Sequence, residues 1–433
     1  MSVNVAKLTE TLRKALSSRP PYLSGTCPVP ADGFDLYYGR GDDARGLNSQ
    51  IDLSKATSAQ LQKLSASCQP ATFGVNQEDV MDEAYRKACK MDVSNFASKF
   101  AVEKSGIMDH VQDELVDESG KVRVELYKLN VYGQDSFFKA HKDTPRGADM
   151  FGSLVIVFPC EHVGGALLLR HEGKEWSFDA ASELAKCTEP SIGYVAFYSD
   201  VEHEVALVTS GYRVTLTYNL YYAADTPEPS IAIRQFASEG EATFKVSVLE
   251  LLDDPTVLPA GGIIGFGLQH EYPVNDQTTL IDMVNHLKGG DALVKRACDQ
   301  LSLKFSLMFA YKDKRGDRVD HSIFSPVYID LSEHREVANL KRELLDCGGM
   351  AVRDALSGDL CEDDSEYDPY WQVAGEDEKP MAIYWVNKPT ANASVKCIYM
   401  AYGNEASLSH YYAKVSLCVF VGPAGSRAQD REM

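Results

Sequence analysis

The chain of 433 residues is 44% hydrophobic and 24% charged, an ordinary balance for a soluble globular protein of two or three domains. Its 43 Lys and Arg residues against 63 Asp and Glu give a formal charge of −20, which argues against a protein that binds a nucleic-acid backbone through a basic surface. No apolar stretch approaches the roughly 18 residues of a membrane helix. Residues 1–18 place Val5, Leu8, Leu12 and Leu16 at helical spacing, without the continuous apolar segment of a secretory signal. We therefore expect an intracellular protein, cytoplasmic or nuclear, with no nucleic-acid or membrane partner.

The ten cysteines are scattered along the chain, and no two of them form a Cys-x-x-Cys pair. Scattered single cysteines are typical of reduced, mostly buried thiols, and not of a disulfide framework or a zinc ribbon. The cysteine pattern therefore agrees with an intracellular location. The oligomeric state is not indicated by any sequence feature.

The first part of the chain, residues 1–118, is predicted to be mainly helical. An amphipathic helix at the N-terminus is followed by a Pro- and Gly-rich stretch and by helical patterns near 57–66, 78–90 and 106–116. We expect these helices to form an N-terminal region of their own.

A different pattern begins at about residue 119. Seven short runs rich in β-branched and aromatic residues follow one another, with turn signals such as Gly164-Gly165 and Ser210-Gly211 between them. Their sequences are KVRVELYKLNVY, GSLVIVFP, GALLLR, KEWSF, IGYVAFY, HEVALV and YRVTLTYNLYY. Short strands at this spacing are typical of an antiparallel sandwich or jelly roll, so a domain of that kind is predicted over 119–224.

The last part of the chain, 230–433, mixes both kinds of pattern and follows a Pro-containing linker. Residues 261–268 and 305–311 are predicted strands, and residues 291–301 and 334–345 are predicted helices. Nine acidic residues between 359 and 378 indicate a solvated loop. The predicted fold class is therefore α+β, with a double-stranded β-helix (jelly-roll) core, N-terminal helices and a C-terminal α+β region of unknown role.

His141-Lys-Asp143 is the first element of a candidate metal site. Residues i and i+2 of an extended chain project to the same side, so the imidazole and the carboxylate can reach one ion. The pattern alone is weak, because His334-Arg-Glu336 repeats it. That second copy lies in a helical pattern, and the residue ten positions after the only later histidine, His410, is Phe420.

Three further residues, later in the chain, could complete a site around the first copy of this motif. His203 follows Asp143 by sixty residues, and Arg213 and Thr215 lie ten and twelve positions after His203. Two histidines and one carboxylate from separate strands make the facial triad that holds non-heme Fe(II) with positions left open. A buried arginine offers a planar fork to a carboxylate, and a threonine at i+2 adds a hydroxyl donor on the same face.

These residues resemble the Fe(II)- and 2-oxoglutarate-dependent dioxygenases, in particular the prolyl 4-hydroxylase-like branch. The resemblance covers about 121–222. Tyr132, nine residues before His141, matches the tyrosine that hydrogen-bonds the cosubstrate in that branch, and Gly164-Gly165 matches a turn before a barrel strand. Arg213 stands where animal and algal prolyl hydroxylases commonly have lysine, although many relatives use arginine. The C-terminal segments are similar, more weakly, to the extension of a large fungal group of such proteins.

The resemblance implies that His141, Asp143 and His203 bind Fe(II), and that Tyr132, Arg213 and Thr215 bind 2-oxoglutarate. It implies O2 as the oxidant, is compatible with ascorbate, and predicts hydroxylation of an aliphatic C–H bond with release of succinate and CO2. The substrate would be a small molecule, a peptide or a protein, with a prolyl residue as the expectation at family level. Two other functions stay open: an iron-binding jelly roll that is a sensor or a non-catalytic interaction module, and a cupin-like metal enzyme that does not use 2-oxoglutarate.

Overall fold

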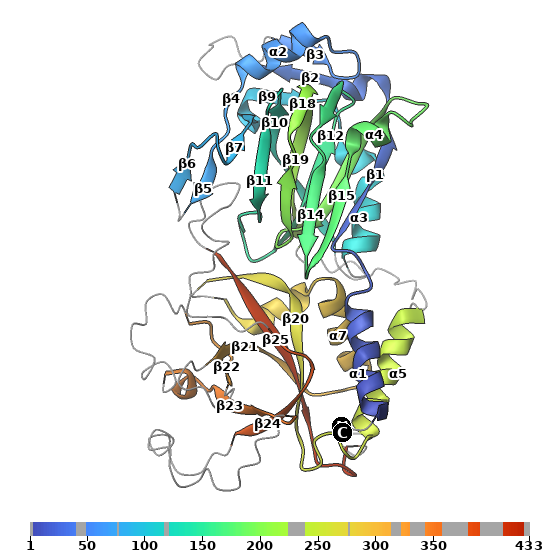
Figure 1. Cartoon of the computed structure of the whole chain (residues 1–433), viewed down its shortest axis with the longest axis vertical. Helices are drawn as coiled ribbons and strands as arrows, with labels where there is room; N and C mark the ends of the chain where they lie inside the picture. The colour runs from blue at the N-terminus through green and yellow to red at the C-terminus, as the bar shows by residue number, and fades with distance from the viewer. Residues whose placement is uncertain are drawn as a thin grey trace. The chain divides into compact units, whose positions relative to one another are not determined.

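The computed structural model of the chain divides into two compact units (Figure 1). It describes residues 3–39, 49–75, 78–116, 121–223, 239–275, 278–312, 322–329, 343–356, 380–389 and 410–427. The jelly-roll unit consists of Pro20–Pro227 and Ile398–His410, and the barrel unit consists of Met1–Arg19, Glu228–Cys397 and Tyr411–Met433. The chain therefore does not follow the predicted division into three consecutive regions.

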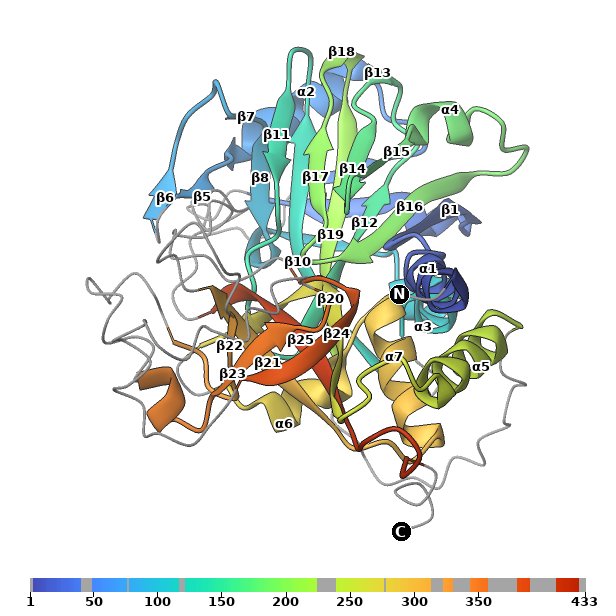
Figure 2. The ribbon, with the colours of Figure 1, turned by 60° about the horizontal axis from the view of Figure 1, so that its bottom comes forward.

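Two antiparallel sheets form the jelly-roll unit. The larger sheet has seven strands in the order β1 (Tyr22–Pro28), β16 (Ser191–Tyr198), β12 (Met150–Val157), β19 (Arg213–Tyr222), β10 (Val122–Tyr132), β8 (Cys89–Asp92) and β4 (Gln69–Pro70). The smaller sheet has five strands in the order β15 (Lys174–Phe178), β14 (Leu167–His171), β17 (Glu202–Val205), β11 (Phe137–His141) and β7 (Arg86–Lys87). Figure 2 shows β10, β19 and β12 side by side. The predicted jelly-roll core is confirmed by these two sheets.

The strands of the larger sheet are buried on both faces where they approach the smaller sheet. Alternate residues of a strand point to opposite faces, and in β10 Leu129 and Val131 join the hydrophobic core. Lys128, Asn130 and Tyr132 alternate with them and are buried as well. Because these three are polar or amphipathic, the second face of β10 lines a polar space instead of an apolar core.

Shorter elements complete the jelly-roll unit. They are η1 (Ala31–Phe34), β2 (Asp35–Tyr38), β3 (Ser49–Asp52), α2 (Ser58–Ser67), β5 (Phe73–Val75), β6 (Glu78–Val80), η2 (Val93–Asn95), β9 (Phe96–Ser98), η3 (Val102–Lys104), α3 (Ile107–Leu115), β13 (His162–Gly164), α4 (Ala180–Leu184) and β18 (Val208–Gly211). The helices predicted near 57–66 and 106–116 are confirmed as α2 and α3. Thr57 begins α2 with a capping box, in which its hydroxyl accepts from the Gln60 N–H and the Gln60 side chain accepts from the Thr57 N–H.

The predicted helix over 78–90 is wrong, because this segment holds the strands β6, β7 and the start of β8. The described residues before position 117 form nine strands besides three α-helices, so the predicted helical N-terminal region is not found. Strand β1, in the stretch taken as Pro- and Gly-rich connection, pairs with β16 along seven residues. Pairing with distant strands decides the structure here, and local sequence patterns do not contain that information.

The barrel unit is a closed six-stranded barrel with helices packed against it. The order around the barrel is β20 (Gly262–Val274), β24 (Met381–Asn387), β23 (Met350–Asp354), β22 (Ser322–Ser325), β21 (Phe305–Lys312) and β25 (Tyr411–Val421). The helical elements are α1 (Val3–Leu16), α5 (Glu239–Asp253), α6 (Leu280–Met283), η4 (Val284–His286) and α7 (Gly289–Gln300). Helix α1 packs against α5 and α7 through the apolar face that the sequence predicted.

The other predictions for the C-terminal region have mixed outcomes. The strands expected at 261–268 and 305–311 and the helix at 291–301 are confirmed as β20, β21 and α7. The expected helix at 334–345, with the second His-x-Glu motif, lies mostly outside the described residues, and so does the acidic segment 359–378.

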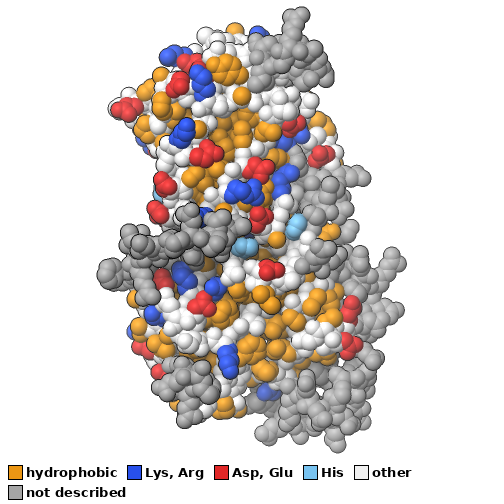
Figure 3. All heavy atoms as spheres, turned by 180° about the vertical axis from the view of Figure 1, so that it is seen from behind, with side chains coloured by type: hydrophobic (Ala, Val, Ile, Leu, Met, Phe, Trp, Pro, Cys, Tyr) orange, Lys and Arg blue, Asp and Glu red, His pale blue; other side chains and the backbone are white. Residues whose placement is uncertain are grey.

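On the face drawn in Figure 3, Lys and Arg side chains are mixed with Asp and Glu side chains. The formal charge of −20 is therefore not gathered into a single acidic field among the described residues of that face. None of the helices in the described part of the chain has the length and apolar character needed to cross a membrane.

We expect Leu154→Ala to destabilise the protein by about 2–5 kcal/mol, because a fully buried leucine of the central strand β12 leaves a cavity when it is truncated. Urea denaturation, followed by tyrosine and tryptophan fluorescence, measures the change. Leu207→Ala is the matched control, since this side chain is 48% exposed, and its effect should stay within about 0.5 kcal/mol. Equal effects of the two substitutions would contradict the described packing.

Candidate functional site

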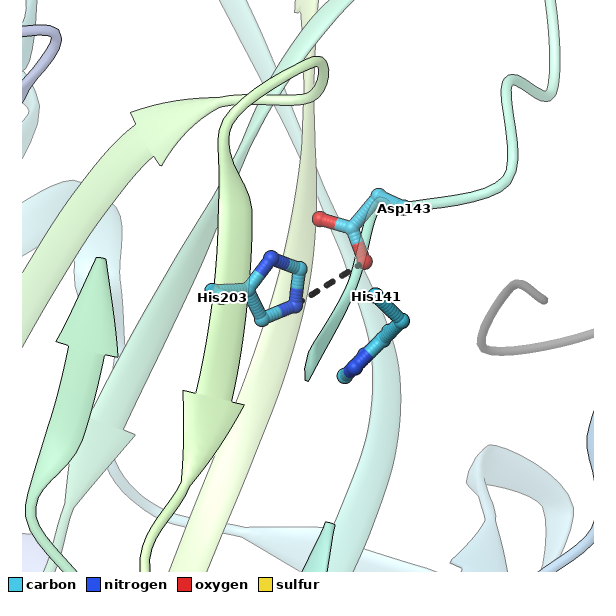
Figure 4. A group of neighbouring side chains, drawn as sticks. All are labelled: His141, Asp143 and His203. Carbon is cyan, nitrogen blue, oxygen red and sulfur yellow. Dashed lines mark ion pairs between the residues drawn. The ribbon is translucent and has the colours of Figure 1, made fainter. Parts of the chain in front are cut away.

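His141, Asp143 and His203 come together in the jelly-roll unit, as the sequence predicted. His141 is the last residue of β11, and its cross-strand partner in β17 is His203. Asp143 follows two residues after β11 and is held by its backbone N–H, which donates to the Ser199 carbonyl at 3.2 Å. One side-chain ligand atom from each of the three residues lies within 4.8 Å of the other two. Figure 4 shows the three side chains pointing toward one another.

Backbone carbonyl groups orient both imidazole rings. Nδ1 of His141 lies 2.8 Å from the Lys139 carbonyl oxygen, and Nδ1 of His203 lies 3.1 Å from the Val201 carbonyl oxygen. A carbonyl oxygen only accepts hydrogen bonds, so each Nδ1 must carry a proton, and Nε2 is the nitrogen whose lone pair is available in the neutral ring. The Nε2 of His203 lies 3.8 Å from Oδ1 of Asp143 (Figure 4). This is the arrangement that metal-binding histidines adopt, with the second ring nitrogen fixed by a hydrogen bond.

The cluster is buried, with exposed fractions of 3% for His141, 4% for Asp143 and 6% for His203. Ser153 of β12 donates its hydroxyl to Oδ2 of Asp143 at 2.5 Å, and the Phe138 ring stacks on the His141 imidazole with 3.6 Å between centroids. Burial, with a smaller effect of neighbouring His203, lowers the pKa of His141 well below its usual range. His141 is therefore neutral at physiological pH, which is the form that binds a metal.

The donor set of two imidazole nitrogens and one carboxylate suits a divalent transition metal of the Fe(II) type. No fourth histidine, cysteine or carboxylate joins this cluster among the residues that the structure describes. Three protein ligands leave coordination positions for other molecules, as in metal sites that perform chemistry.

Arg213, the first residue of β19, is a buried cation, and the described residues offer it no acidic partner. Its side chain is 2% exposed, its Nε is buried without a hydrogen-bond partner, and no ion pair reaches it among the described residues. Two acidic residues of this unit pair with other arginines: Glu202 lies 3.6 Å from Arg170, and Asp149 lies 3.3 Å from Arg123. Burial lowers the pKa of Arg213, but an arginine stays charged in proteins. An unpaired buried guanidinium is costly, so a bound anion is the expected partner.

Tyr132 and Thr215 lie beside Arg213. Tyr132 is the cross-strand partner of Arg213, and the guanidinium carbon lies 5.5 Å from the centre of the tyrosine ring. Thr215 is two residues farther along β19 and is 1% exposed. Within the described ranges, neither hydroxyl has a hydrogen-bond partner in the protein. The sequence prediction that these three residues would lie together is therefore met by the structure.

Gly165 makes room for the arginine. Its φ is +73°, in the left-handed region that favours glycine, and a Cβ at this position would lie 2.9 Å from Cδ of Arg213 and 2.8 Å from Cγ2 of Val208. The Gly164-Gly165 pair is therefore needed both for the turn and for the close approach to Arg213.

One pocket contains all six residues predicted from the sequence. They share its wall with residues of both sheets, namely Arg86, Tyr127, Lys128, Asn130, Phe138, Ser153, Val155, Leu167, Phe197, Val205 and Thr217. The cluster of metal-ligand type and the unpaired guanidinium therefore belong to one space between the two sheets.

Arg86 and Lys128 are pocket residues that the sequence did not predict. Lys128 lies two and four residues before Asn130 and Tyr132 on the same predicted strand, so the period of two could have identified it. No such signal marked Arg86, because the sequence predicted a helix for its segment. In the structure Arg86 lies in β7, where it pairs with Phe138 of β11. Burial, reinforced by the positive charges of Lys90 and Arg86, lowers the pKa of Lys128 to about 7, and Asp92 opposes this shift.

Comparison with known proteins agrees with the resemblance predicted from sequence. Residues 127–221 match the family model described as the 2OG-Fe(II) oxygenase superfamily. This range contains the three clustered residues and Tyr132, Arg213 and Thr215. The predictions of the family resemblance and of a 2-oxoglutarate-dependent oxygenase are therefore confirmed.

Solved structures of low similarity include several prolyl hydroxylases. A prolyl-4-hydroxylase from Pseudomonas putida aligns with 49% of this chain and 98% of its own, at 17% identity and a TM-score of 0.29. A prolyl hydroxylase from Trichoplax adhaerens, solved with a hypoxia inducible factor peptide fragment, covers 50% and 90%, at 15% identity and a TM-score of 0.27. A viral collagen prolyl hydroxylase from Paramecium Bursaria Chlorella virus-1 covers 47% and 97%, at 10% identity and a TM-score of 0.25. No curated protein matches the chain.

We expect the purified protein to bind one Fe(II), and His141→Ala, Asp143→Ala or His203→Ala to remove most of it, because three ligands leave no replacement. Anaerobic titration with Fe(II) and measurement of metal content check this. His162→Ala is the matched control: its Nδ1 lies 2.7 Å from a backbone carbonyl in the same way, but it is not part of the cluster. Full Fe(II) binding by the His203 variant would contradict the assignment.

The lowered pKa of Lys128 predicts a pH dependence of stability. Between pH about 7 and 10.5 the unfolded chain keeps the Lys128 proton and the folded chain does not, so the free energy of unfolding rises with pH over this range. The difference in stability between wild type and Lys128→Met should therefore shift in favour of wild type as the pH increases. Urea denaturation of both proteins at pH 7, 8.5 and 10 measures it, and a constant difference would contradict the lowered pKa.

Proposed function

We propose, from the premise that residues 127–221 form a 2OG-Fe(II) oxygenase domain, that this chain hydroxylates an aliphatic C–H bond with Fe(II), 2-oxoglutarate and O2. The substrate gains one oxygen atom as a hydroxyl group, and 2-oxoglutarate is converted to succinate and CO2 with the other. A prolyl residue of a peptide is the substrate expected from the family resemblance.

The observation that carries the proposal is the unpaired guanidinium of Arg213 in the same pocket as the His-Asp-His cluster. A metal site alone is compatible with many reactions. A buried fork of donors without a protein carboxylate calls for an anionic ligand, and 2-oxoglutarate has a carboxylate at each end. One end with the adjacent oxo group suits the open positions of a metal, and the other suits Arg213.

The protein residues have separate tasks in this proposal. His141, Asp143 and His203 would hold Fe(II), which supplies the oxidative chemistry when it is bound. Arg213 would pair with the distal carboxylate of 2-oxoglutarate, and the hydroxyl groups of Tyr132 and Thr215 are suited to donate to the same molecule. The Ser153 hydroxyl keeps the Asp143 carboxylate in one orientation.

Apolar side chains in the pocket wall exclude water from the reacting groups. Leu167 and Val205 come from the smaller sheet, and Phe197 comes from the larger sheet and lies 4.6 Å from the His203 ring, centroid to centroid. Such a wall strengthens the electrostatic interactions within the site and limits side reactions.

The two other functions inferred from sequence account less well for the same residues. A cupin-like enzyme without 2-oxoglutarate has no use for an unpaired arginine in its pocket. Turnover of 2-oxoglutarate distinguishes an enzyme from a sensor or an interaction module. Release of succinate from 2-oxoglutarate, dependent on Fe(II) and on the three clustered residues, tests the proposed function against both.

Arg213→Ala should weaken binding of 2-oxoglutarate by tens- to thousands-fold while Fe(II) stays bound, since loss of a buried charged partner costs roughly 2–5 kcal/mol. Arg213→Lys should be milder, because it keeps the charge but not the fork. Thr215→Ala should cost about 1 kcal/mol, as expected for one hydrogen bond. Anaerobic titration, monitored by the visible charge-transfer band of the chelated 2-oxo acid, measures all three.

Arg123→Ala is the matched control for the arginine. Arg123 lies on β10 and pairs with Glu125 and Asp149 at the surface, so its removal should leave 2-oxoglutarate affinity unchanged. Equal affinities of wild type and Arg213→Ala for 2-oxoglutarate would rule out the carboxylate role of Arg213 and favour the cupin-like enzyme.

A further inference from the structure

Strand β11 contains an extra residue just before it reaches the metal-ligand cluster. Between Phe138 and His141 the strand advances by three residues, while the paired residues of β17 advance by two. An extra residue against a partner strand is a β-bulge, and bulges occur often beside active sites, where they re-aim a side chain. The direction of the His141 side chain therefore depends on the contacts of Lys139 and Ala140, the two residues in between.

Tyr85, in the turn before β7, holds both residues of this bulge. Its carbonyl accepts from the Lys139 N–H at 3.1 Å, and its hydroxyl donates to the Ala140 carbonyl at 2.7 Å. Tyr85 is fixed in turn by its own N–H, which donates to the Asp82 carbonyl at 3.0 Å. The Lys139 carbonyl lies 2.8 Å from Nδ1 of His141. The residue that orients the imidazole is therefore itself held by Tyr85.

Arg86, the first residue of β7, reaches the same imidazole through an aromatic ring. Its cross-strand partner is Phe138, and the guanidinium carbon lies 4.3 Å from the centre of the Phe138 ring. That ring stacks on the His141 imidazole with 3.6 Å between centroids. The guanidinium is anchored by Nη1, which donates to the Thr72 carbonyl at 2.7 Å, and by Nη2, which donates to the Asn130 side-chain oxygen at 3.1 Å. The ring that covers His141 is therefore held in place from β7.

We propose that Tyr85 and Arg86 are positioning residues of the metal site, which set the direction in which His141 presents its Nε2. Tyr85 acts through the backbone of the bulge, and Arg86 acts through Phe138. Both lie before residues 127–221, so a segment outside the family match contributes to the site. Groups that orient a metal-binding histidine typically strengthen metal binding by about 10–100-fold. This inference rests on the part of the proposed function that assigns the cluster to Fe(II), and it is independent of the substrate.

Anaerobic titration of the full chain with Fe(II) tests the role of Tyr85. Tyr85→Phe removes only the hydroxyl and should weaken Fe(II) binding by about fivefold, as expected for one hydrogen bond. Tyr198→Phe is the matched control, because the Tyr198 hydroxyl donates to the Leu115 carbonyl, also at 2.7 Å, and its removal should leave Fe(II) affinity unchanged. Equal losses in the two variants would show that Fe(II) affinity follows general stability, and would overturn the role of Tyr85.

A double-mutant cycle tests whether Arg86 acts through Phe138. Arg86→Met and Phe138→Leu should each weaken Fe(II) binding by at least about tenfold. The double variant should bind Fe(II) no more weakly than Phe138→Leu alone, since both substitutions remove the same support of His141. Phe138→Tyr keeps the ring and should retain the wild-type affinity, which distinguishes loss of the ring contact from a misfolded pocket. Lys87→Met, next to Arg86 in β7 but not part of the pocket wall, is the control without effect.

Co(II) provides a second measurement that does not depend on affinity or turnover. The visible absorption of bound Co(II) reports the geometry of its ligands. At saturating Co(II), Tyr85→Phe and Arg86→Met should therefore give spectra shifted from that of wild type, whereas Tyr198→Phe and Lys87→Met should give the wild-type spectrum. A substitution that only destabilises the fold would leave the spectrum of the saturated protein unchanged.

Three results would overturn the inference. The first is wild-type Fe(II) affinity and an unshifted Co(II) spectrum in Tyr85→Phe and Arg86→Met, and the second is additive losses in the cycle of Arg86 with Phe138. The third is a loss of 2-oxoglutarate affinity in Fe(II)-saturated Arg86→Met as large as in Arg213→Ala, which would place Arg86 in the cosubstrate site. Failure of the proposed function has a different signature, because a protein that binds Fe(II) in the predicted way but forms no succinate keeps its positioning residues and loses the reaction.

Discussion

The register between β11 and β17 is the constraint on which the site depends. It places His141 directly opposite His203, and a slip of one residue would turn one imidazole to the other face of the sheet. Both strands are short, so they do not define this register alone. The larger sheet supplies the rest: Ser199, at the end of β16, accepts the Asp143 N–H, and Ser153 of β12 donates to the Asp143 carboxylate. The three ligand-type side chains are thus held by both sheets.

A second constraint is the cost of a buried charge. Arg213 lies at the start of a strand that is otherwise apolar or hydroxyl-bearing toward the pocket, and the described protein offers it only the face of Tyr132. Natural proteins rarely retain such a cation for stability, because an apolar side chain of similar volume is as good or better. Gly164 and Gly165 both have a positive φ, and a Cβ at Gly165 would lie too close to the Arg213 side chain, so these glycines leave the space that the arginine occupies. The arrangement is costly for folding and useful for binding an anion, which is typical of functional sites.

The sequence predicted the site better than it predicted the surrounding fold. The longer strands of the predicted jelly roll, such as β10, β12, β16 and β19, show their period of two, and Tyr132, His141 and Arg213 lie at strand ends. The segment 78–90 was misread because Val80, Ala84 and Ala88 repeat at helical spacing, while its actual strands are only two to four residues long. The structure of β7 and β8 comes from pairing with β11 and β10, which are far away in sequence, whereas β6 pairs with the adjacent β5. Arg86 was missed for the same reason.

Long-range packing also explains the division of the chain. The amphipathic pattern of α1 correctly predicts a helix with one apolar face, but it does not say which partner covers that face. The partners are α5 and α7, more than two hundred residues later, so the first helix belongs to the barrel unit. In the barrel, β24 pairs in parallel with β20 and with β23, and hairpin signals in the sequence predict only antiparallel pairs of neighbouring strands. Local periodicity identifies elements, whereas their partners are decided by surfaces that only the folded chain brings together.

The electrostatics of the pocket differ from those of the chain as a whole. A formal charge of −20 repels anions at long range, yet the pocket wall has three basic side chains, Arg86, Lys128 and Arg213, and one carboxylate, although burial lowers the pKa of Lys128 to about 7. At physiological ionic strength the Debye length is about 8 Å, so distant surface charges are largely screened at the pocket, while buried groups are screened much less. The buried guanidinium of Arg213 is therefore expected to influence the binding of an anion more than the distant acidic surface does. Anionic ligands would then be selected by desolvated contacts inside the pocket and not by long-range steering, and their association should depend only weakly on salt.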